Sequence, residues 1–150
     1  MSRARRRCDE MSRILALRVL STRLAENGAL EEKRALHIAG EEREAAQEDL
    51  IAAIGDWDRA LTFPRFDPLT VAAWGAIVNQ QAVSVAERDA TVKQHREALA
   101  EAERGYHHAS AEERCAQDLW RKSQTRLERQ REEQALALRD DEITRAAFGR

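Results

Sequence analysis

The chain has 150 residues, of which 35% are charged, 43% are hydrophobic and only 5% are aromatic. The length fits one domain, but so high a charged fraction leaves little material for a compact core and favours an elongated helical structure. The formal net charge of −2 excludes a global attraction to nucleic acid or anionic membranes. The abundance of strong helix formers is typical of coiled coils and long helices.

An arginine cluster opens the chain: Arg3, Arg5, Arg6 and Arg7. Such a cluster is more often a solvated tail than a docking surface. Cys8, Asp9 and Glu10 follow where the apolar core of a secretory signal would begin, so no such signal is expected. With Cys115 as the second of only two cysteines, free thiols and a cytoplasmic protein are expected.

The first helix is predicted from about residue 9 to 60. Its residues repeat at alternating spacings of three and four, as in the seam of a coiled coil: Leu36, Ala39, Arg43, Ala46, Leu50, Ala53, Trp57 and Ala60. Upstream, Leu17, Leu20 and Leu24 lie on a stripe that does not continue this register. Because Asn27-Gly28 falls between the two stripes, a kink, stutter or helix break is expected near Asn27.

Both prolines of the chain fall in the segment 61–68, which a helix cannot cross smoothly. A turn is therefore predicted at 61–67. Asp67 is a favourable N-cap and Pro68 suits the first position of a helix, so a second helix should begin there.

The second helix is predicted from about 68 to 147. A seven-residue repeat marks one face of it: Val71, Val78, Val85, Val92, Leu99, Tyr106, Glu113, Trp120 and Leu127. The companion seam positions are small or polar, for example Ala109, Ala116 and Ser123, so the seam should pack closely but bury little area per layer. The predicted fold is all-α: an antiparallel two-helix coiled-coil hairpin with a longer second helix, forming one domain over 1–150.

Folding back near Pro64 pairs residues whose numbers sum to about 128, with an error of one helical turn. Helix one then ends opposite residue 119, and Trp120 onward is expected to project as a single helix. Its apolar side chains would lack intramolecular cover: Trp120, Leu127, Leu136, Leu138, Ile143 and Phe148. Such an overhang is expected to bind another surface, although Trp120 closing the last layer against helix one is the alternative.

No phosphate loop, nucleophile elbow, dinucleotide fingerprint or zinc-spaced set occurs, so neither an enzyme nor a cofactor is expected. His107 and His108 are adjacent and point about 100° apart on a helix, unlike a metal pair at i and i+4. The four histidines are interpreted as surface or seam residues.

Two segments carry a resemblance to a known family. Trp74-Gly75-Ala76-Ile77-Val78-Asn79-Gln80-Gln81 is similar to the aromatic and glutamine-rich start of helix two in the FliJ/YscO family, and Leu119-Trp120-Arg121-Lys122-Ser123-Gln124-Thr125-Arg126-Leu127 is similar to its downstream basic segment. The basic amino terminus and two unequal helices resemble the same family. These proteins are central stalks of flagellar and virulence type III secretion, and the likeness leans to the virulence or Hrp-type branch.

The resemblance implies a cytoplasmic, non-enzymatic protein, peripheral to the inner-membrane secretion apparatus and monomeric when isolated. Its implied partners are a hexameric secretion ATPase, an export gate protein and export chaperones. The expected ATPase-binding residues are Arg3, Arg5, Arg6, Arg7, Trp120, Arg121, Lys122, Arg126 and Leu127. The expected residues facing the export gate are Asn79, Gln80 and Gln81.

Two other functional classes remain open for this sequence. A generic coiled-coil adaptor would dimerise into a four-helix bundle by burying the overhang of one copy on another. A nucleic-acid or membrane-surface binder would use Arg3 to Arg7, and its association would weaken steeply with salt.

Overall fold

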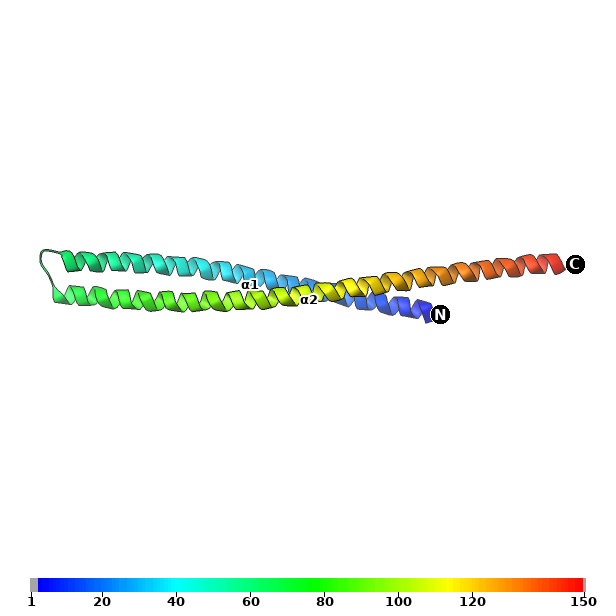
Figure 1. The fold of residues 1–150 in the computed structure, drawn as a ribbon, viewed down its shortest axis with the longest axis horizontal. Helices are drawn as coiled ribbons and strands as arrows, with labels where there is room; N and C mark the ends of the chain where they lie inside the picture. The colour runs from blue at the N-terminus through cyan, green and yellow to red at the C-terminus, as the bar shows by residue number, and fades with distance from the viewer. Residues whose placement is uncertain (1–2, 150) are drawn as a thin grey trace. The chain divides into compact units, whose positions relative to one another are not determined.

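A computed structural model describes residues 3–149 as two helices joined by one turn (Figure 1). Helix α1 spans Arg3–Thr62 and helix α2 spans Pro68–Phe148. The predicted all-α hairpin with a longer second helix is confirmed. Over the described residues 3–149, neither helix has a stretch apolar enough to span a lipid bilayer.

The chain divides into two compact units. The hairpin unit comprises residues 26–104, and the open-end unit comprises residues 3–25 and 105–149 of the described chain. The division falls close to a glycine in each helix, Gly28 in α1 and Gly105 in α2.

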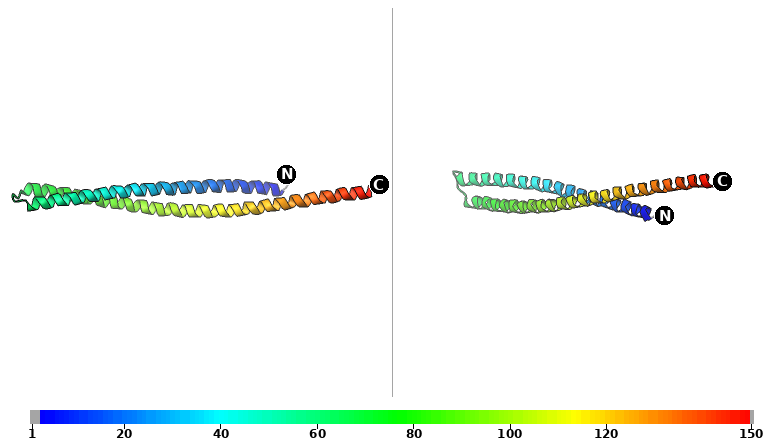
Figure 2. Two further views of the ribbon diagram at one scale, coloured as in Figure 1. Left: turned by 90° about the horizontal axis from the view of Figure 1, so that it is seen from above. Right: turned by 45° about the vertical axis from the view of Figure 1, so that its right-hand side comes forward.

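In the hairpin unit, α1 and α2 lead away from the turn side by side (Figures 1 and 2). Asp67 caps α2: its carboxylate accepts hydrogen bonds from the Leu69 backbone N–H at 3.1 Å and from the Thr70 hydroxyl at 2.6 Å. The bond from the Thr70 hydroxyl and the bond from the Leu69 N–H hold the pKa of Asp67 below its ordinary value of 3.8. The predicted cap is therefore confirmed.

The seam of the hairpin unit follows the predicted residues of α1. Alanines recur along it at intervals of seven, and Ala39, Ala46 and Ala53 are 5–7% exposed. Alanine lets two helices approach closely, since no larger side chain separates them. The indole of Trp57 lies against Gly75, where an added methyl group would meet Trp57 Nε1 at 3.6 Å. Trp57 Nε1 is buried and has no hydrogen-bond partner among the described residues.

Charged side chains bridge the two helices beside this seam. Arg43 Nε donates to Asp89 at 2.7 Å, and Arg88 donates to Glu42 at 2.5 Å. The residue numbers of these pairs sum to 132 and 130, within one turn of the predicted register. These bridges favour one register because a slip along the seam would separate each guanidinium from its carboxylate.

In the open-end unit the small buried residues of the seam lie on α2, whereas in the hairpin unit they lie on α1. Here the buried residues belong to α2: Ala109 at 8%, Ala116 at 7% and Ser123 at 8% exposure. Facing them, the half-buried positions of α1 recur at spacings of three and four: Ala4, Cys8, Met11, Leu15, Val19, Thr22 and Ala25.

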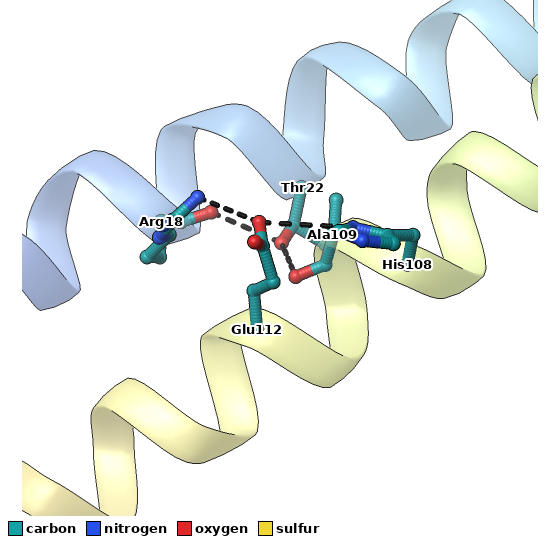
Figure 3. A network of polar contacts seen from close by, with 5 residues as sticks. All are labelled: Arg18, Thr22, His108, Ala109 and Glu112. Atoms are coloured by element: carbon teal, nitrogen blue, oxygen red, sulfur yellow. Dashed lines mark hydrogen bonds and ion pairs between the residues drawn. The ribbon is translucent and has the colours of Figure 1, made fainter.

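A polar cluster fixes the register of this unit (Figure 3). Arg18 of α1 donates to Glu112 of α2 at 2.6 Å, and the Thr22 hydroxyl lies 3.2 Å from the Ala109 carbonyl oxygen. His108 lies 3.8 Å from the same Glu112 carboxylate. Arg18 and His108 therefore both lie close to the Glu112 carboxylate, between the buried Ala109 and Ala116 of α2.

Two expectations for α1 are wrong. The helix begins at Arg3 rather than near residue 9, and it runs through Asn27 without a break. Leu17, Leu20 and Leu24 are not seam residues, since they are 66%, 54% and 64% exposed. The seam in this stretch mixes small and polar side chains with Met11, Leu15 and Val19.

The expected overhang is also shorter. Because α1 starts earlier, its first residues cover Trp120 and Leu127, which are half-buried in the seam. Trp120 therefore packs in the seam with the first helix, as the alternative held, but the last layer lies further along α2, beyond Trp120. The overhang is redefined as residues 131–148, all exposed, and Figure 2 shows α2 continuing past the start of α1.

Candidate functional site

A groove lies where the first turns of α1 meet the part of α2 that precedes the overhang. We call it the basic groove. Its lining residues are Arg3, Ala4, Arg7, Met11, Leu119, Lys122, Ser123, Arg126 and Gln130. All of them belong to the open-end unit.

Helical spacing explains how the four cations of the basic groove come together. Arg3 and Arg7 are four residues apart on α1, and Lys122 and Arg126 are four apart on α2, so each pair shares one face of its helix. Like charges in this arrangement destabilise a helix by roughly 0.2–0.5 kcal/mol per pair. Neither pair helps the helices to form, which favours a role in binding.

The cations of the groove have no acidic partner among the described residues. Within residues 3–149, none of Arg3, Arg7, Lys122 and Arg126 forms an ion pair. By contrast, Arg18 in the same unit is paired with Glu112. The described residues that line the groove include no carboxylate, so a bound anion would meet only positive charge there.

The floor of the groove is mixed in character. Met11 is half-buried, Ser123 is 8% exposed, and Leu119 is 55% exposed at the edge. An apolar floor between cations suits a partner that carries apolar and acidic side chains together, since the floor supplies contact area and the rim supplies charge.

The structure brings together four of the nine expected ATPase-binding residues. Arg5, Arg6 and Arg121 are exposed but do not line the groove, while Trp120 and Leu127 are half-buried in the seam. The sequence interpretation missed Met11, Leu119, Ser123 and Gln130 as lining residues. Continuing the α1 register upstream from Leu36 identifies Met11 as a seam residue and places it opposite these α2 positions.

The expected gate-facing residues also include both exposed and half-buried side chains. Asn79 and Gln80 are exposed on α2 in the hairpin unit. Gln81 is half-buried at a seam position, so it is less available to a partner than expected.

The acidic, histidine and cysteine side chains of residues 3–149 do not form a metal-binding group. Over 3–149, no group of three or more His, Cys, Asp or Glu side chains is arranged to hold a metal ion. His37 and His95 each lie 3.3 Å from a glutamate oxygen, of Glu41 and Glu32 respectively. Comparisons of the chain with models of protein families, with curated proteins and with solved structures found no match.

Proposed function

We propose that this protein is a non-enzymatic stalk component of a type III protein secretion apparatus. In this proposal the open-end unit enters the central pore of the hexameric secretion ATPase. The observation that carries it is the basic groove, to which both helices supply cations that form no ion pair within 3–149, beside a partly apolar floor. The resemblance of two segments to the FliJ/YscO family supplies the identity of the machine.

The expected contact is between the basic groove and acidic or polar groups of the ATPase ring. Arg3, Arg7, Lys122 and Arg126 would orient the stalk in the pore, and the overhang would add apolar contacts from Leu136 and Ile143, which are 59% and 66% exposed. An isolated helix of this length is marginally stable in water, so binding would also order the overhang.

The hairpin unit is assigned to the export gate and chaperones in this proposal. Asn79 and Gln80 are the exposed candidates for the gate contact. Replacing both with lysine in cells should impair secretion while the purified variant keeps its helical content. Wild-type secretion by that variant would remove these residues from the gate contact. The proposed location is the cytoplasm, at the inner-membrane secretion apparatus.

The test of the ATPase contact compares two variants with the same change in charge. Arg7→Glu/Lys122→Glu reverses two charges of the basic groove, whereas Arg114→Glu/Arg129→Glu reverses two exposed charges elsewhere on α2 in the same unit. Affinity for the purified ATPase of the same secretion system should fall by about tenfold or more for the groove variant only. Stimulation of ATP hydrolysis should fall in parallel.

Two results would count against the proposal. A wild-type chain that neither binds the ATPase nor changes its activity would refute the stalk function. Equal losses in both variants would show that net charge, rather than the basic groove, governs the association.

A homodimeric adaptor is the second candidate, and the bare overhang favours it. Residues 131–148 leave four large apolar side chains exposed: Leu136, Leu138, Ile143 and Phe148. Sedimentation equilibrium separates the two candidates, because a stable dimer supports the adaptor and a monomer supports the stalk.

A further inference from the structure

A second unpartnered surface lies on the outer side of α1, away from the basic groove. Ile14, Leu17, Leu20 and Leu24 are 42%, 66%, 54% and 64% exposed. At 3.6 residues per turn these four side chains fall within about 120° of the helix circumference, so they form one stripe. We call it the outer leucine stripe.

The stripe does not face α2. The half-buried seam residues Leu15 and Thr22 point roughly 140–160° away from its centre. Thr22 contacts the Ala109 carbonyl oxygen across the seam, which fixes the direction of α2. The described part of the open-end unit therefore leaves the leucines uncovered.

The segment of α1 that carries the stripe is basic. Residues 3–25 contain seven arginines and two acidic residues, Asp9 and Glu10, which gives this segment a net charge of +5. Arg6, Glu10 and Arg13 lie on the same face of α1 as the leucines, close to the start of the stripe, so this face carries two cations and one carboxylate. The chain as a whole has a net charge of −2, so this basic character is local.

We propose that the outer leucine stripe and its arginines bind the surface of an anionic lipid bilayer. A helix that combines arginines with a stripe of leucines lies in the interface, with the apolar side chains among the acyl chains and the cations at the headgroups. Anionic headgroups add attraction for each nearby cation, and this attraction is screened by salt. Seam contacts and lipid contacts use opposite faces of α1, so the fold is kept.

A bilayer fits this surface better than a protein partner does. The stripe is a ridge of aliphatic side chains without the Trp and Tyr that usually anchor protein interfaces. A bilayer accepts a ridge of any shape, whereas a protein must supply a matching groove.

A second copy is a weaker fit for the same surface. The overhang of a second copy could attract the arginines beside the stripe, since residues 131–149 contain five acidic and three basic residues. However, Leu136 and Leu138 point about 160° apart on the helix, so the overhang has no single apolar face to lay on the stripe.

The inference does not rest on the proposed function. It concerns the outer face of α1, whereas the ATPase contact is assigned to the groove between α1 and α2. A chain bound in an ATPase pore would have its outer face covered, so lipid binding would belong to chains outside the ring.

The experiment measures binding of the purified full chain to vesicles by co-sedimentation. The probes are vesicles of phosphatidylglycerol mixed with phosphatidylcholine, and vesicles of phosphatidylcholine alone. We expect binding to the mixed vesicles, with the partition coefficient at least about tenfold higher than for phosphatidylcholine and reduced by a similar factor in high salt.

Matched variants locate the surface. Leu17→Ser/Leu20→Ser/Leu24→Ser should lower the partition coefficient by about tenfold or more, because it removes the inserted side chains. The control Leu136→Ser/Leu138→Ser/Ile143→Ser changes three side chains of similar exposure on the overhang and should bind as the wild type does. Circular dichroism should show that both variants keep their helical content.

Several results would overturn the inference. These are a failure of the wild type to bind mixed vesicles, an equal loss in the control variant, and binding that ignores salt. A wild-type dimer that the leucine substitutions convert to a monomer would assign the stripe to a second copy instead.

Discussion

Ala46 offers the sharpest test of the alanine seam in the hairpin unit. It is 7% exposed, with Ala39 and Ala53 at 5% one heptad on either side, while its neighbours Ala45 and Gln47 are both exposed. Ala46→Leu forces a larger side chain between helices whose approach depends on alanine. Overpacking of this kind costs about 1–3 kcal/mol.

The structural consequence extends to the ion pairs beside the seam. If the helices separate to accept the leucine, the 2.7 Å contact between Arg43 and Asp89 lengthens and its contribution falls. That loss is small, because both side chains are exposed and such pairs contribute about 0–1 kcal/mol. We therefore expect a total destabilisation of about 1–3 kcal/mol, most of it from packing.

The assay is urea unfolding followed by circular dichroism, with Ala52→Leu as the control. The control adds the same side chain to the same helix at an exposed position, so its free energy of unfolding should stay within about 0.5 kcal/mol of the wild type. Equal destabilisation of the two variants, or a more stable Ala46→Leu chain, would refute the placement of Ala46 in a close seam.

Three further predictions concern single residues of the hairpin unit. Trp57→Phe removes the buried indole N–H that has no hydrogen-bond partner among the described residues, so the free energy of unfolding should fall by less than about 1 kcal/mol or rise; a larger loss would contradict this expectation and mean that the packing lost with the indole outweighs the gain from removing the N–H. Gly75→Ala should raise the free energy of unfolding by about 1 kcal/mol, because the added methyl group meets Trp57 at an ordinary contact distance and alanine favours the helix; a destabilised variant would mean that the indole lies closer. Because the folded-state pKa of Asp67 lies below its ordinary value of 3.8, its cap stabilises fully above that value and loses its contribution as the pH falls through the folded pKa. Asp67→Asn should flatten this part of the stability profile between neutral and acid pH, and an unchanged acid dependence would contradict the cap.

The hairpin unit was predictable because its sequence patterns agree with one another. The apolar repeat from Leu36 to Trp57 and the valines of α2 have the same period, and Asp67-Pro68 is a strong signal for a helix start. The register followed within one turn, since both prolines restrict the turn to a few residues.

The open-end unit was harder to predict because several of its leucines lie outside its seam. Leu17, Leu20 and Leu24 suggested a seam in a new register, whereas the seam there includes residues such as Ala25, Thr22 and Cys8. Counting spacings of three and four upstream from Leu36 would have found the correct stripe, because periodicity locates a seam even where hydrophobicity is weak.

The basic groove was missed for a different reason, the expected start of the first helix. With helix one starting near Asp9, Arg3 and Arg7 belong to a tail, and Lys122 and Arg126 belong to a bare helix. The structure starts the helix at Arg3, which places the two pairs of cations across one groove. The charge pattern alone therefore identified the four residues but could not bring them together.

Cross-linking between the two sides of the basic groove tests most directly that the two helices meet there. In a chain with Cys8 and Cys115 replaced by serine, cysteines at Met11 and Leu119 should form a rapid intramolecular cross-link with a short bismaleimide. The control pair, Met11 with Leu136, should remain unlinked, because Leu136 lies in the overhang. An unlinked Met11–Leu119 pair, or equal linking of the control, would contradict the pairing on which the groove depends.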